Sequence, residues 1–561
     1  MKTAYIIIYT YLLAFFIMAC ATQSSPTGGE RDEEPPKLIS SIPINQELNY
    51  TGRKIELVFD ELIAINNVNK ELIITPRIEQ DYEVKYKKNH VLISFENPLD
   101  SNTTYTFTFR ESIKDLNEGN VPENLNLAFS TGDYLDSLSI TGMVYDLFTN
   151  QKRKDISVAL YSIKDTMNVF DDPPLYITKT DTEGNYYLNN VKNGRYRIYA
   201  FDDKNNNLSL QTDNEKYGFR EEIIKLDSNK YNIDMSLFYL NIDTMKLQSA
   251  RTSGHYFHIK YNKYITEYTI QSLDTNIIIH NSLLDDHKEI RIYNTSIIKD
   301  SIPVVTIVKD SLLETSRDTV YIKFEETKRE KEKYSLKITS ENINYLKPEI
   351  KGKIEFNKPS TFYNPDSLFL FVDSLSSVNI TNENLKWNKN FTEVTIYKEV
   401  NKEIFEPKLT GDTTKKGKEV FTQIKPKIYI GKGAFQSIER DTSIYKSTSI
   451  KKEISDENTG IIKIKINNKD INYILQLLNK NNEILKTINK SNNTDITFNK
   501  LIAGEYKIRI LIDSNNNGKW EVGNIKKNMP PERIIYYISE EGNETITVRA
   551  NWEIGPLNIN F

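Results

Sequence analysis

Between residues 37 and 131 the chain alternates between apolar and polar side chains with a period of two. A period of two places every second side chain on the same face of a strand, whereas a helix repeats its apolar positions every three or four residues. The pattern therefore predicts a β-sandwich, because this region has no apolar repeat of the helical period. The alternating stretches, each bounded by turn residues, are 55–60, 72–76, 91–95, 105–109 and 127–131.

The strand ends and turns of this region carry a set of short motifs. They are Pro35-Pro36, Ser41-Ile42-Pro43, Val58-Phe59-Asp60, Asn102-Thr103-Thr104-Tyr105, Ile113-Lys114-Asp115, Gly119-Asn120 and Phe129-Ser130-Thr131-Gly132. Together they resemble the bacterial Ig-like domain known from surface-layer-associated proteins. The resemblance implies an Ig-like sandwich over residues 37–134, in which Phe and Tyr fill the core and Asp, Asn and Gly build turns. It implies no catalytic residue.

The pattern changes over residues 138–231, without a long linker before it. The informative stretches are 140–146, 158–161, 180–188 and 191–198. They resemble the transthyretin-like module found beside carboxypeptidases and in many surface proteins, which implies a second, smaller sandwich. Asp181 to Gly184 predicts a hairpin turn with Gly184 at a positive φ angle.

A second copy of this pattern closes the chain. Val191, Gly194, Tyr196, Ile198, Asp203, Asn205 and Asn207 recur, at a constant offset, as Leu501, Gly504, Tyr506, Ile508, Asp513, Asn515 and Asn517. The repeat predicts a second transthyretin-like sandwich over residues 457–561. A weaker repeat of the Ig-like pattern, with insertions, predicts a second Ig-like sandwich over 346–456. Residues 232–345 are also strand-like and predict a β-rich domain of unknown type.

The first nineteen residues predict a lipoprotein signal peptide. Lys2 is followed by an apolar run over residues 4–18, and Ala19 precedes Cys20, the only cysteine of the chain. The run is shorter than the roughly 20 apolar residues of a membrane-spanning helix. Ile17-Met18-Ala19-Cys20 resembles the lipobox of bacterial lipoproteins, which implies removal of residues 1–19 and acylation of Cys20. The alternative is an ordinary secretory signal with an incidental cysteine.

Residues 20–36 contain few apolar side chains and predict a flexible, lipidated tether. Ala21, in place of Asp directly after Cys20, resembles the pattern that sends lipoproteins to an outer membrane. The acidic cluster over 30–34 is either part of a spacer or an export signal. We therefore expect a lipid-anchored outer-membrane protein, facing either the cell surface or the periplasm.

Charge and cysteine content narrow the function further. The 561 residues contain 73 Lys and Arg against 77 Asp and Glu, a net charge of −4. Such a weak charge on a long chain predicts no nucleic-acid partner. A single cysteine allows no intramolecular disulfide, so apolar cores must stabilise the domains.

One stretch has the spacing of a calcium-binding loop. Asp513, Asn515 and Asn517 are followed by Gly518, and Glu521 occupies the ninth position. Oxygen ligands at positions one, three and five, with a glycine at six, are typical of Ca²⁺ loops. The twelfth position lacks the usual glutamate, so the sequence predicts at most a weak Ca²⁺ site. The alternative is an Asx-rich hairpin whose side chains bind their own backbone.

Catalytic motifs are missing from the sequence: it has no G-x-S-x-G, no H-E-x-x-H and no phosphate-binding loop. His255 and His258 lie three apart in a predicted strand, so they face opposite sides and cannot bind one metal together. We therefore expect a non-enzymatic, lipid-anchored envelope protein that presents β-sandwich modules for binding or structural support, without a required cofactor. Its partners would be the membrane, through the lipid, and an unidentified protein or glycan. Two alternatives stay open: a periplasm-facing assembly or secretion partner, and an enzyme with its site in residues 232–345.

Overall fold

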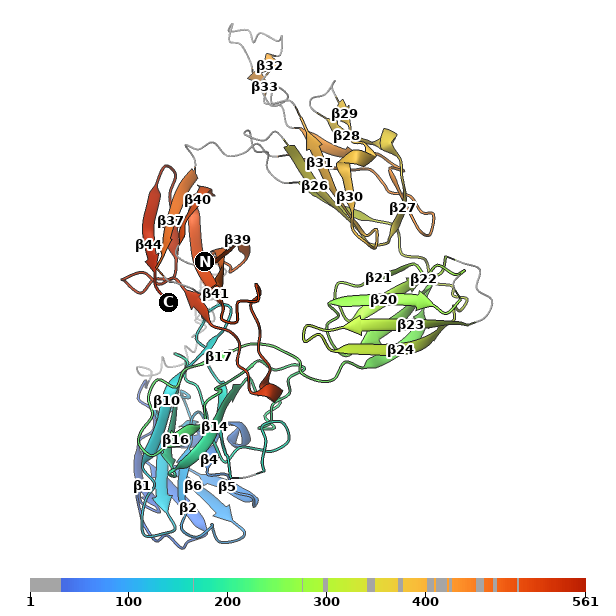
Figure 1. The fold of residues 1–561 in the computed structure, drawn as a ribbon. Coiled ribbons are helices and arrows are strands. Elements are labelled where there is room, and N and C mark those ends of the chain that lie inside the picture. Colours follow the sequence, from blue (N-terminus) through green and yellow to red (C-terminus); the bar gives the residue numbers. More distant parts are fainter. Residues whose placement is uncertain are drawn as a thin grey trace, which may run out of the picture. The chain divides into compact units, whose positions relative to one another are not determined.

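The computed structural model describes residues 32–164, 166–274, 276–295, 301–340, 349–371, 377–400, 408–409, 421–422, 426–450, 459–467, 472–491 and 494–561. These residues form strands, together with the four-residue helix α2 (Val68–Glu71) and the 3-10 turns η1 (Pro365–Ser367), η2 (Asn382–Asn384) and η5 (Ile525–Lys527). The predicted all-β fold of tandem sandwiches is confirmed (Figure 1). No helix within these ranges has the length and hydropathy needed to cross a bilayer.

The chain divides into two compact units. Unit 1 holds the described residues of Met1–Asp146, Gln151–Leu210 and Tyr217–Leu237. Unit 2 holds those of Leu147–Asn150, Gln211–Lys216 and Phe238–Phe561.

The first sandwich of unit 1 packs two antiparallel sheets, β1-β2-β6-β5 and β4-β7-β9, with the short pair β3-β8 beside them. Its strands are β1 (Leu38–Ile42), β2 (Lys54–Phe59), β3 (Ile63–Ile65), β4 (Ile73–Thr75), β5 (Tyr82–Lys87), β6 (His90–Phe95), β7 (Thr104–Thr108), β8 (Ile113–Asp115) and β9 (Asn126–Ser130). Alternate residues such as Phe59, Phe107 and Phe129 are 0% exposed and form the core between the sheets. The period-two pattern of the sequence therefore has its physical origin in this two-layer packing.

The second sandwich of unit 1 has the sheets β13-β10-β17 and β12-β11-β14-β15, and β16 also pairs with β14. Its strands are β10 (Leu138–Asp146), β11 (Ser157–Ser162), β12 (Tyr176–Lys179), β13 (Asn185–Val191), β14 (Gly194–Phe201), β15 (Tyr217–Phe219), β16 (Ile224–Leu226) and β17 (Met235–Leu237). The predicted turn before β13 is confirmed, because Gly184 has a φ of +76° and donates its N–H to the Asp181 carbonyl.

Unit 2 begins with a sandwich of the sheets β18-β19-β22-β21 and β20-β23-β24. Its strands are β18 (Leu247–Ser253), β19 (Tyr256–Tyr261), β20 (Glu267–Ser272), β21 (Asn281–Leu283), β22 (Glu289–Tyr293), β23 (Ile302–Lys309) and β24 (Thr315–Ile322). We call it the middle sandwich. Its core includes Ile259, Ile290 and Val304, each 0% exposed.

The next sandwich of unit 2 repeats the strand order of the first Ig-like one. Its sheet β25-β26-β31-β30 matches β1-β2-β6-β5, and the short pair β27-β35 matches β3-β8. A further sheet has the order β29-β28-β34-β36. The strands are β25 (Leu336–Ser340), β26 (Glu349–Phe356), β27 (Ser360–Tyr363), β28 (Leu368–Phe371), β29 (Ser377–Asn379), β30 (Leu385–Trp387), β31 (Glu393–Glu399), β32 (Lys408–Leu409), β33 (Phe421–Thr422), β34 (Lys427–Ile430), β35 (Phe435–Ser437) and β36 (Lys446–Ser449). We call it the second Ig-like sandwich.

The last sandwich has the same topology as the second one of unit 1. The sheet β40-β37-β44 matches β13-β10-β17, including a parallel pair at β37-β44, and β39-β38-β41-β42 matches β12-β11-β14-β15. Its strands are β37 (Thr459–Ile466), β38 (Asn472–Asn479), β39 (Ile484–Ser491), β40 (Thr494–Ile502), β41 (Gly504–Asp513), β42 (Ile534–Tyr536), β43 (Ile546–Val548) and β44 (Glu553–Ile559).

Candidate functional site

The predicted lipidation site, Cys20, and the signal peptide of residues 1–19 lie outside the described residues. The tether over 20–36 lies outside them up to residue 31. Its described part, residues 32–36, is irregular chain. Lipid anchoring therefore stays a prediction.

The predicted calcium ligands lie at the end of β41 and in the loop after it, and the structure brings their side chains together. Asp513 is 1% exposed, and its two carboxylate oxygens accept the backbone N–H groups of Asn517 and Gly518, at 3.0 and 2.8 Å. Asn515 Oδ1 accepts the same Asn517 N–H at 3.0 Å. Glu521 accepts hydrogen bonds from the Nδ2 groups of Asn515 and Asn517, both at 2.9 Å. Each of these oxygens already faces an N–H donor.

The equivalent loop of the first copy has the same backbone hydrogen bonds. Asp203 accepts the N–H groups of Asn207 and Leu208, both at 3.1 Å, and Asn205 Oδ1 accepts the Asn207 N–H at 3.1 Å. Leu208 has a φ of +62°, in the same left-handed region as Gly518 at +82°. A glycine is therefore not required for this loop shape, which is that of an Asx-rich hairpin.

Sequence reasoning missed Glu532, which supports the loop from a separate segment. Its carboxylate accepts the backbone N–H groups of Ser514 at 2.7 Å and of Glu521 at 2.8 Å. Its own carbonyl accepts the Trp520 indole N–H at 2.9 Å. No local spacing signals this role, because the contact forms only when the loop folds back on itself. Within the described ranges, no group of three His, Cys, Asp or Glu side chains is arranged to hold a metal.

The histidines of the middle sandwich have separate neighbours. His258 Nδ1 pairs with Glu289 of β22. His287 stacks on Tyr264 with ring centroids 4.5 Å apart. Burial lowers the pKa of His280. Each of these three histidines therefore lies in an environment of its own.

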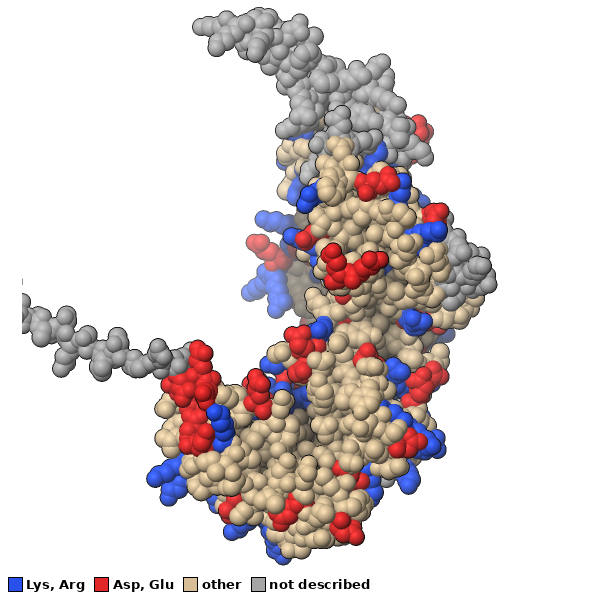
Figure 2. Space-filling view, turned by 90° about the vertical axis from the view of Figure 1, so that its left-hand side faces the viewer, with Lys and Arg blue, Asp and Glu red and all other residues tan. Residues whose placement is uncertain are grey.

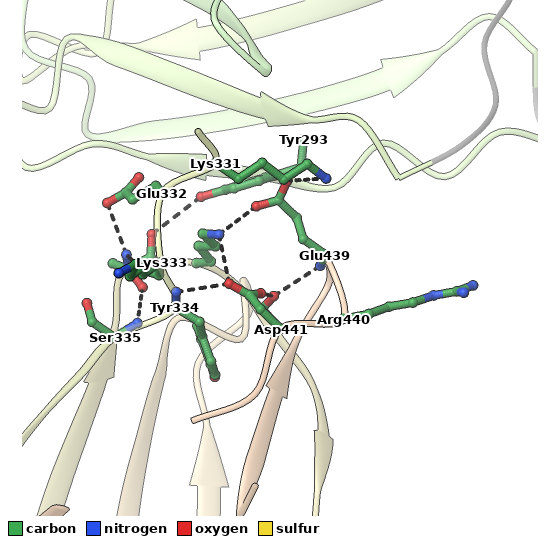
Figure 3. A network of polar contacts seen from close by, with 12 residues as sticks. Tyr293, Lys331, Glu332, Lys333, Tyr334, Ser335, Glu439, Arg440 and Asp441 are labelled. Atoms are coloured by element: carbon green, nitrogen blue, oxygen red, sulfur yellow. Dashed lines mark hydrogen bonds and ion pairs between the residues drawn. The ribbon is translucent and has the colours of Figure 1, made fainter. Parts of the chain in front are cut away.

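The middle sandwich contacts the second Ig-like sandwich, within unit 2, beside a buried ion pair of the latter. Lys358, just before β27, is 0% exposed. Its Nζ lies 2.7 Å from Glu439 Oε2 and 3.0 Å from Asp441 Oδ2. Tyr256 of β19 donates its hydroxyl to the same Glu439 oxygen at 3.1 Å. We call this contact the closed joint. Figure 3 shows Glu439 between Tyr293 of the middle sandwich and Asp441 of the second Ig-like sandwich.

The charges of the closed joint stabilise one another. Burial disfavours the ammonium of Lys358, but its hydrogen bonds to Glu439 and Asp441 outweigh this and raise its pKa. Burial also disfavours the Asp441 carboxylate, yet the hydrogen bond from Ser437 and the ion pair with Lys358 lower the pKa of Asp441. Burial and the nearby Glu439 carboxylate raise the pKa of Tyr256 to about 12. A charged lysine between carboxylates is therefore the stable state at neutral pH.

Unit 1 has a joint of a different kind. A groove of about 800 Å³ lies between its first and second sandwiches, where β4 lies beside β12 and β7 beside β13. Ion pairs cross this joint: Arg110 pairs with Glu71 of its own sandwich at 3.2 Å and reaches across to Asp155. Lys154 reaches back to Glu111 at 3.5 Å. We call this contact the open joint.

Basic and acidic side chains are mixed on the surface. On the face drawn in Figure 2, Lys and Arg side chains alternate with Asp and Glu side chains over the described residues. Most ion pairs at exposed positions, such as Lys85 with Glu83 at 2.7 Å, contribute little to stability.

Comparison with known families identifies part of the chain. The model of the bacterial Ig-like domain matches residues 32–131. This match confirms the resemblance that the sequence motifs indicate for the first sandwich. The fold and this match define a multidomain β-sandwich protein with an N-terminal bacterial Ig-like domain. No curated protein matches the chain.

Several solved structures are similar in part. The Bacillus anthracis TIE protein is 10% identical, with 96% of this chain and 76% of that chain covered and a TM-score of 0.13. The major pilin subunit BcpA of Bacillus cereus is 11% identical, with 76% of this chain and 98% of that chain covered and a TM-score of 0.12. The N-terminal part of the bacterial S-layer protein SbsC is 12% identical, with 51% of this chain and 44% of that chain covered and a TM-score of 0.14. The match thus spans less than half of that SbsC fragment.

Proposed function

We propose that this chain is a non-enzymatic, lipid-anchored protein of the outer membrane whose β-sandwiches are coupled in pairs to present a binding surface or to support the envelope. The observation that carries the proposal is the closed joint. Two sandwiches connected by a flexible linker would not need Tyr256 of one sandwich to donate a hydrogen bond to the buried Glu439 of the other. The bacterial Ig-like domain at residues 32–131 supports the same reading.

The closed joint resists separation of its two sandwiches. Opening it would expose Glu439, whose side chain is 2% exposed, together with Lys358. Tyr256, Tyr293 and Ile438 form a small apolar cluster around the same contact. Opening would break the hydrogen bond from Tyr256 to Glu439 and expose this cluster, while Lys358 and Glu439 stay paired within the second Ig-like sandwich. The loss of these contacts disfavours opening, so the pair of sandwiches should behave as one body. A coupled pair of this kind suits a mechanical or display role.

The enzyme alternative has less support in the middle sandwich. One pocket at this sandwich, among the described residues, is lined by Glu267 as its one carboxylate, together with Lys309 and, from the second Ig-like sandwich, Lys389. A hydrolytic site of the two-carboxylate type needs a second acid close by. The periplasm-facing alternative has the same architecture as the surface-exposed form, and the two differ in accessibility on the intact cell.

Two measurements test the proposal. Wild-type protein and the Cys20→Ala variant are followed through membrane fractionation, and intact cells are treated with protease. We expect wild-type protein in the outer-membrane fraction and the variant in soluble fractions, because only the cysteine can carry the lipid. A variant that still fractionates with the membrane contradicts anchoring through Cys20. Cleavage on intact cells indicates surface display, and protection indicates a periplasmic face.

A further inference from the structure

The open joint of unit 1 has the size and the chemistry of a ligand site. Its groove of about 800 Å³ lies within the range of about 300–1,000 Å³ typical of small-molecule sites. One wall is the outer face of the sheet β4-β7-β9, and the other is formed by β12 and β13. All of these elements belong to unit 1.

The Ig-like wall is a polar sheet face. Thr75 of β4 lies opposite Thr106 of β7, and Thr108 of β7 lies opposite Asn126 of β9. The intervening Phe107 points the other way and is 0% exposed in the core. Because successive side chains alternate between faces, the groove receives hydroxyls and amides from these strands.

The transthyretin-like wall adds an aromatic ring. In β13 the core residues Tyr186 and Leu188 alternate with Tyr187 and Asn189, which line the groove. Tyr187 is 57% exposed and is among the residues that line the groove, so its ring is accessible to a ligand there. A hydrogen bond from Thr106 Oγ1 to Asn190 Oδ1, 3.2 Å long, links the two walls.

Threonine side chains line the groove on the side of the Ig-like wall. Thr75 is 8% exposed and is one of the lining residues. Its hydroxyl is not one of the buried polar atoms that lack a hydrogen-bond partner in the described residues. A ligand hydroxyl in the groove would take the place of water beside such a threonine.

The charges of the groove cancel. Its lining contains three cations and three carboxylates: Arg110, Lys154, Lys179, Glu111, Glu123 and Asp181. Arg110 and Lys154 are already paired with carboxylates. The groove therefore has no net charge with which to attract an ionic ligand. The remaining polar lining is made of Thr, Asn and Gln side chains, which both donate and accept hydrogen bonds.

We infer that the open joint binds a neutral oligosaccharide. Sugar hydroxyls match Thr and Asn side chains that donate and accept, and the apolar face of a sugar ring packs on an exposed aromatic ring such as Tyr187. This inference deepens the proposed function, because the groove would be what the anchored chain presents.

The test uses the purified full chain and isothermal titration calorimetry. The probes are maltotetraose, cellotetraose and chitotetraose, with tetragalacturonate and an uncharged heptapeptide as comparison ligands. Tyr187→Ala removes the ring, and Thr75→Val removes a hydroxyl of the groove at nearly constant volume. Tyr86→Ala is the matched control, because Tyr86 of β5 is 53% exposed and is not among the residues that line the groove. Circular dichroism verifies that each variant folds.

We expect at least one neutral tetrasaccharide to bind. Tyr187→Ala should weaken that binding about tenfold and Thr75→Val about threefold, while Tyr86→Ala leaves it unchanged. The inference is overturned if none of the three sugars binds, if binding survives both groove variants unchanged, or if only tetragalacturonate or the heptapeptide binds. The binding assay needs no membrane. If no sugar binds, the proposed anchoring through Cys20 is unaffected, and if Cys20→Ala does not release the protein, the proposed sugar binding is unaffected.

Discussion

The two described joints couple β-sandwiches in opposite ways. The closed joint of unit 2 buries Lys358 beside Glu439 and Asp441, and Tyr256 donates a hydrogen bond to Glu439. The open joint of unit 1 leaves a polar groove of about 800 Å³, and Arg110 and Lys154 bridge it at partly exposed positions. A smaller pocket of about 350 Å³, lined by Glu267 and Lys309 of the middle sandwich and Lys389 of the second Ig-like sandwich, lies between the sandwiches of unit 2. The two joints therefore differ in how deeply their ion pairs are buried and in the size of the space beside them. In our proposal the larger groove of unit 1 binds a ligand, and the buried contact of unit 2 holds its two sandwiches together.

The largest effect is expected from breaking the closed joint. Lys358→Met should leave the buried Glu439 with Lys331 alone, 3.3 Å away, and the 35% exposed Asp441 without its lysine. We expect a cost of about 3 kcal/mol, at the low end for a broken buried pair, in the free energy of unfolding of this pair of sandwiches. Urea denaturation followed by circular dichroism measures the loss. Lys353→Met is the matched control in the same sandwich. Its Nζ pairs with Glu355 and Glu393 at 2.9 and 2.8 Å but is 42% exposed, so we expect a loss below about 1 kcal/mol. Equal losses of unfolding free energy in the two variants would contradict a special stabilising role for the buried Lys358 at the closed joint.

A smaller effect is expected at the open joint. Arg110→Met should cost about 1–3 kcal/mol, because Glu71, with an 8% exposed side chain, loses its guanidinium partner while Lys70 still lies 3.6 Å away. Lys154→Met, in a pair whose side chains are about half exposed, should change stability little. Thermal unfolding of both variants provides the measurement. A loss for Arg110→Met as large as that for Lys358→Met would mean that the two joints do not differ in kind.

The pH dependence of stability should sharpen the contrast further. The pKa of Asp441 is lowered in the folded state, so its contribution is complete above the unfolded pKa of about 3.9 and is lost as the pH falls through the lower folded value. The pKa of Lys358 is raised, so its contribution is complete below about pH 10.4 and is lost as the pH rises through the folded value. Urea titrations of wild type and Lys358→Met from pH 3 to pH 8 test this. The difference between the two free energies of unfolding should be constant above pH 4 and should shrink below it. A difference that shrinks between pH 5 and pH 7 would contradict the titration of Asp441 as its cause.

The smallest effect is expected from calcium. If the loop after β41 is an Asx-rich hairpin, EDTA should leave the melting temperature of the full chain unchanged to within about 1 °C, because N–H donors already occupy the oxygens of Asp513 and Glu521. Differential scanning calorimetry with EDTA and with 1 mM CaCl₂ (roughly the concentration range of weak extracellular sites) measures the shift. A rise of several degrees with calcium, abolished by Asp513→Asn, would establish the metal site instead.

The sequence predicts the modules much better than the contacts between them. Alternation identifies the strands around Phe107 and Phe129, because a two-layer sheet requires one apolar face on each strand. The repeat at Asp203 and Asp513 identifies two sandwiches that share a topology. Both signals are local, and each lies within one module.

The joints depend on residues that are far apart in the sequence. From the sequence alone, Lys358 has no feature that distinguishes it from a surface lysine, and only the fold places Glu439 beside it. Thr106 likewise forms its hydrogen bond to Asn190 only when two sandwiches pack. No periodicity marks such pairs, because a single polar residue at a strand end is compatible with solvent as well as with a partner. The described fold of each module was therefore predictable, and the groove of the open joint was not.

The contrast between the joints is tested most directly by hydrogen–deuterium exchange of the full chain with and without the tetrasaccharide that binds most tightly. We expect slower exchange in the groove residues 178–190 of unit 1, and unchanged exchange in residues 256–261 and 435–441 around the closed joint. Slower exchange at the closed joint, or no change in residues 178–190 despite binding, would contradict the division between a structural joint and a binding joint.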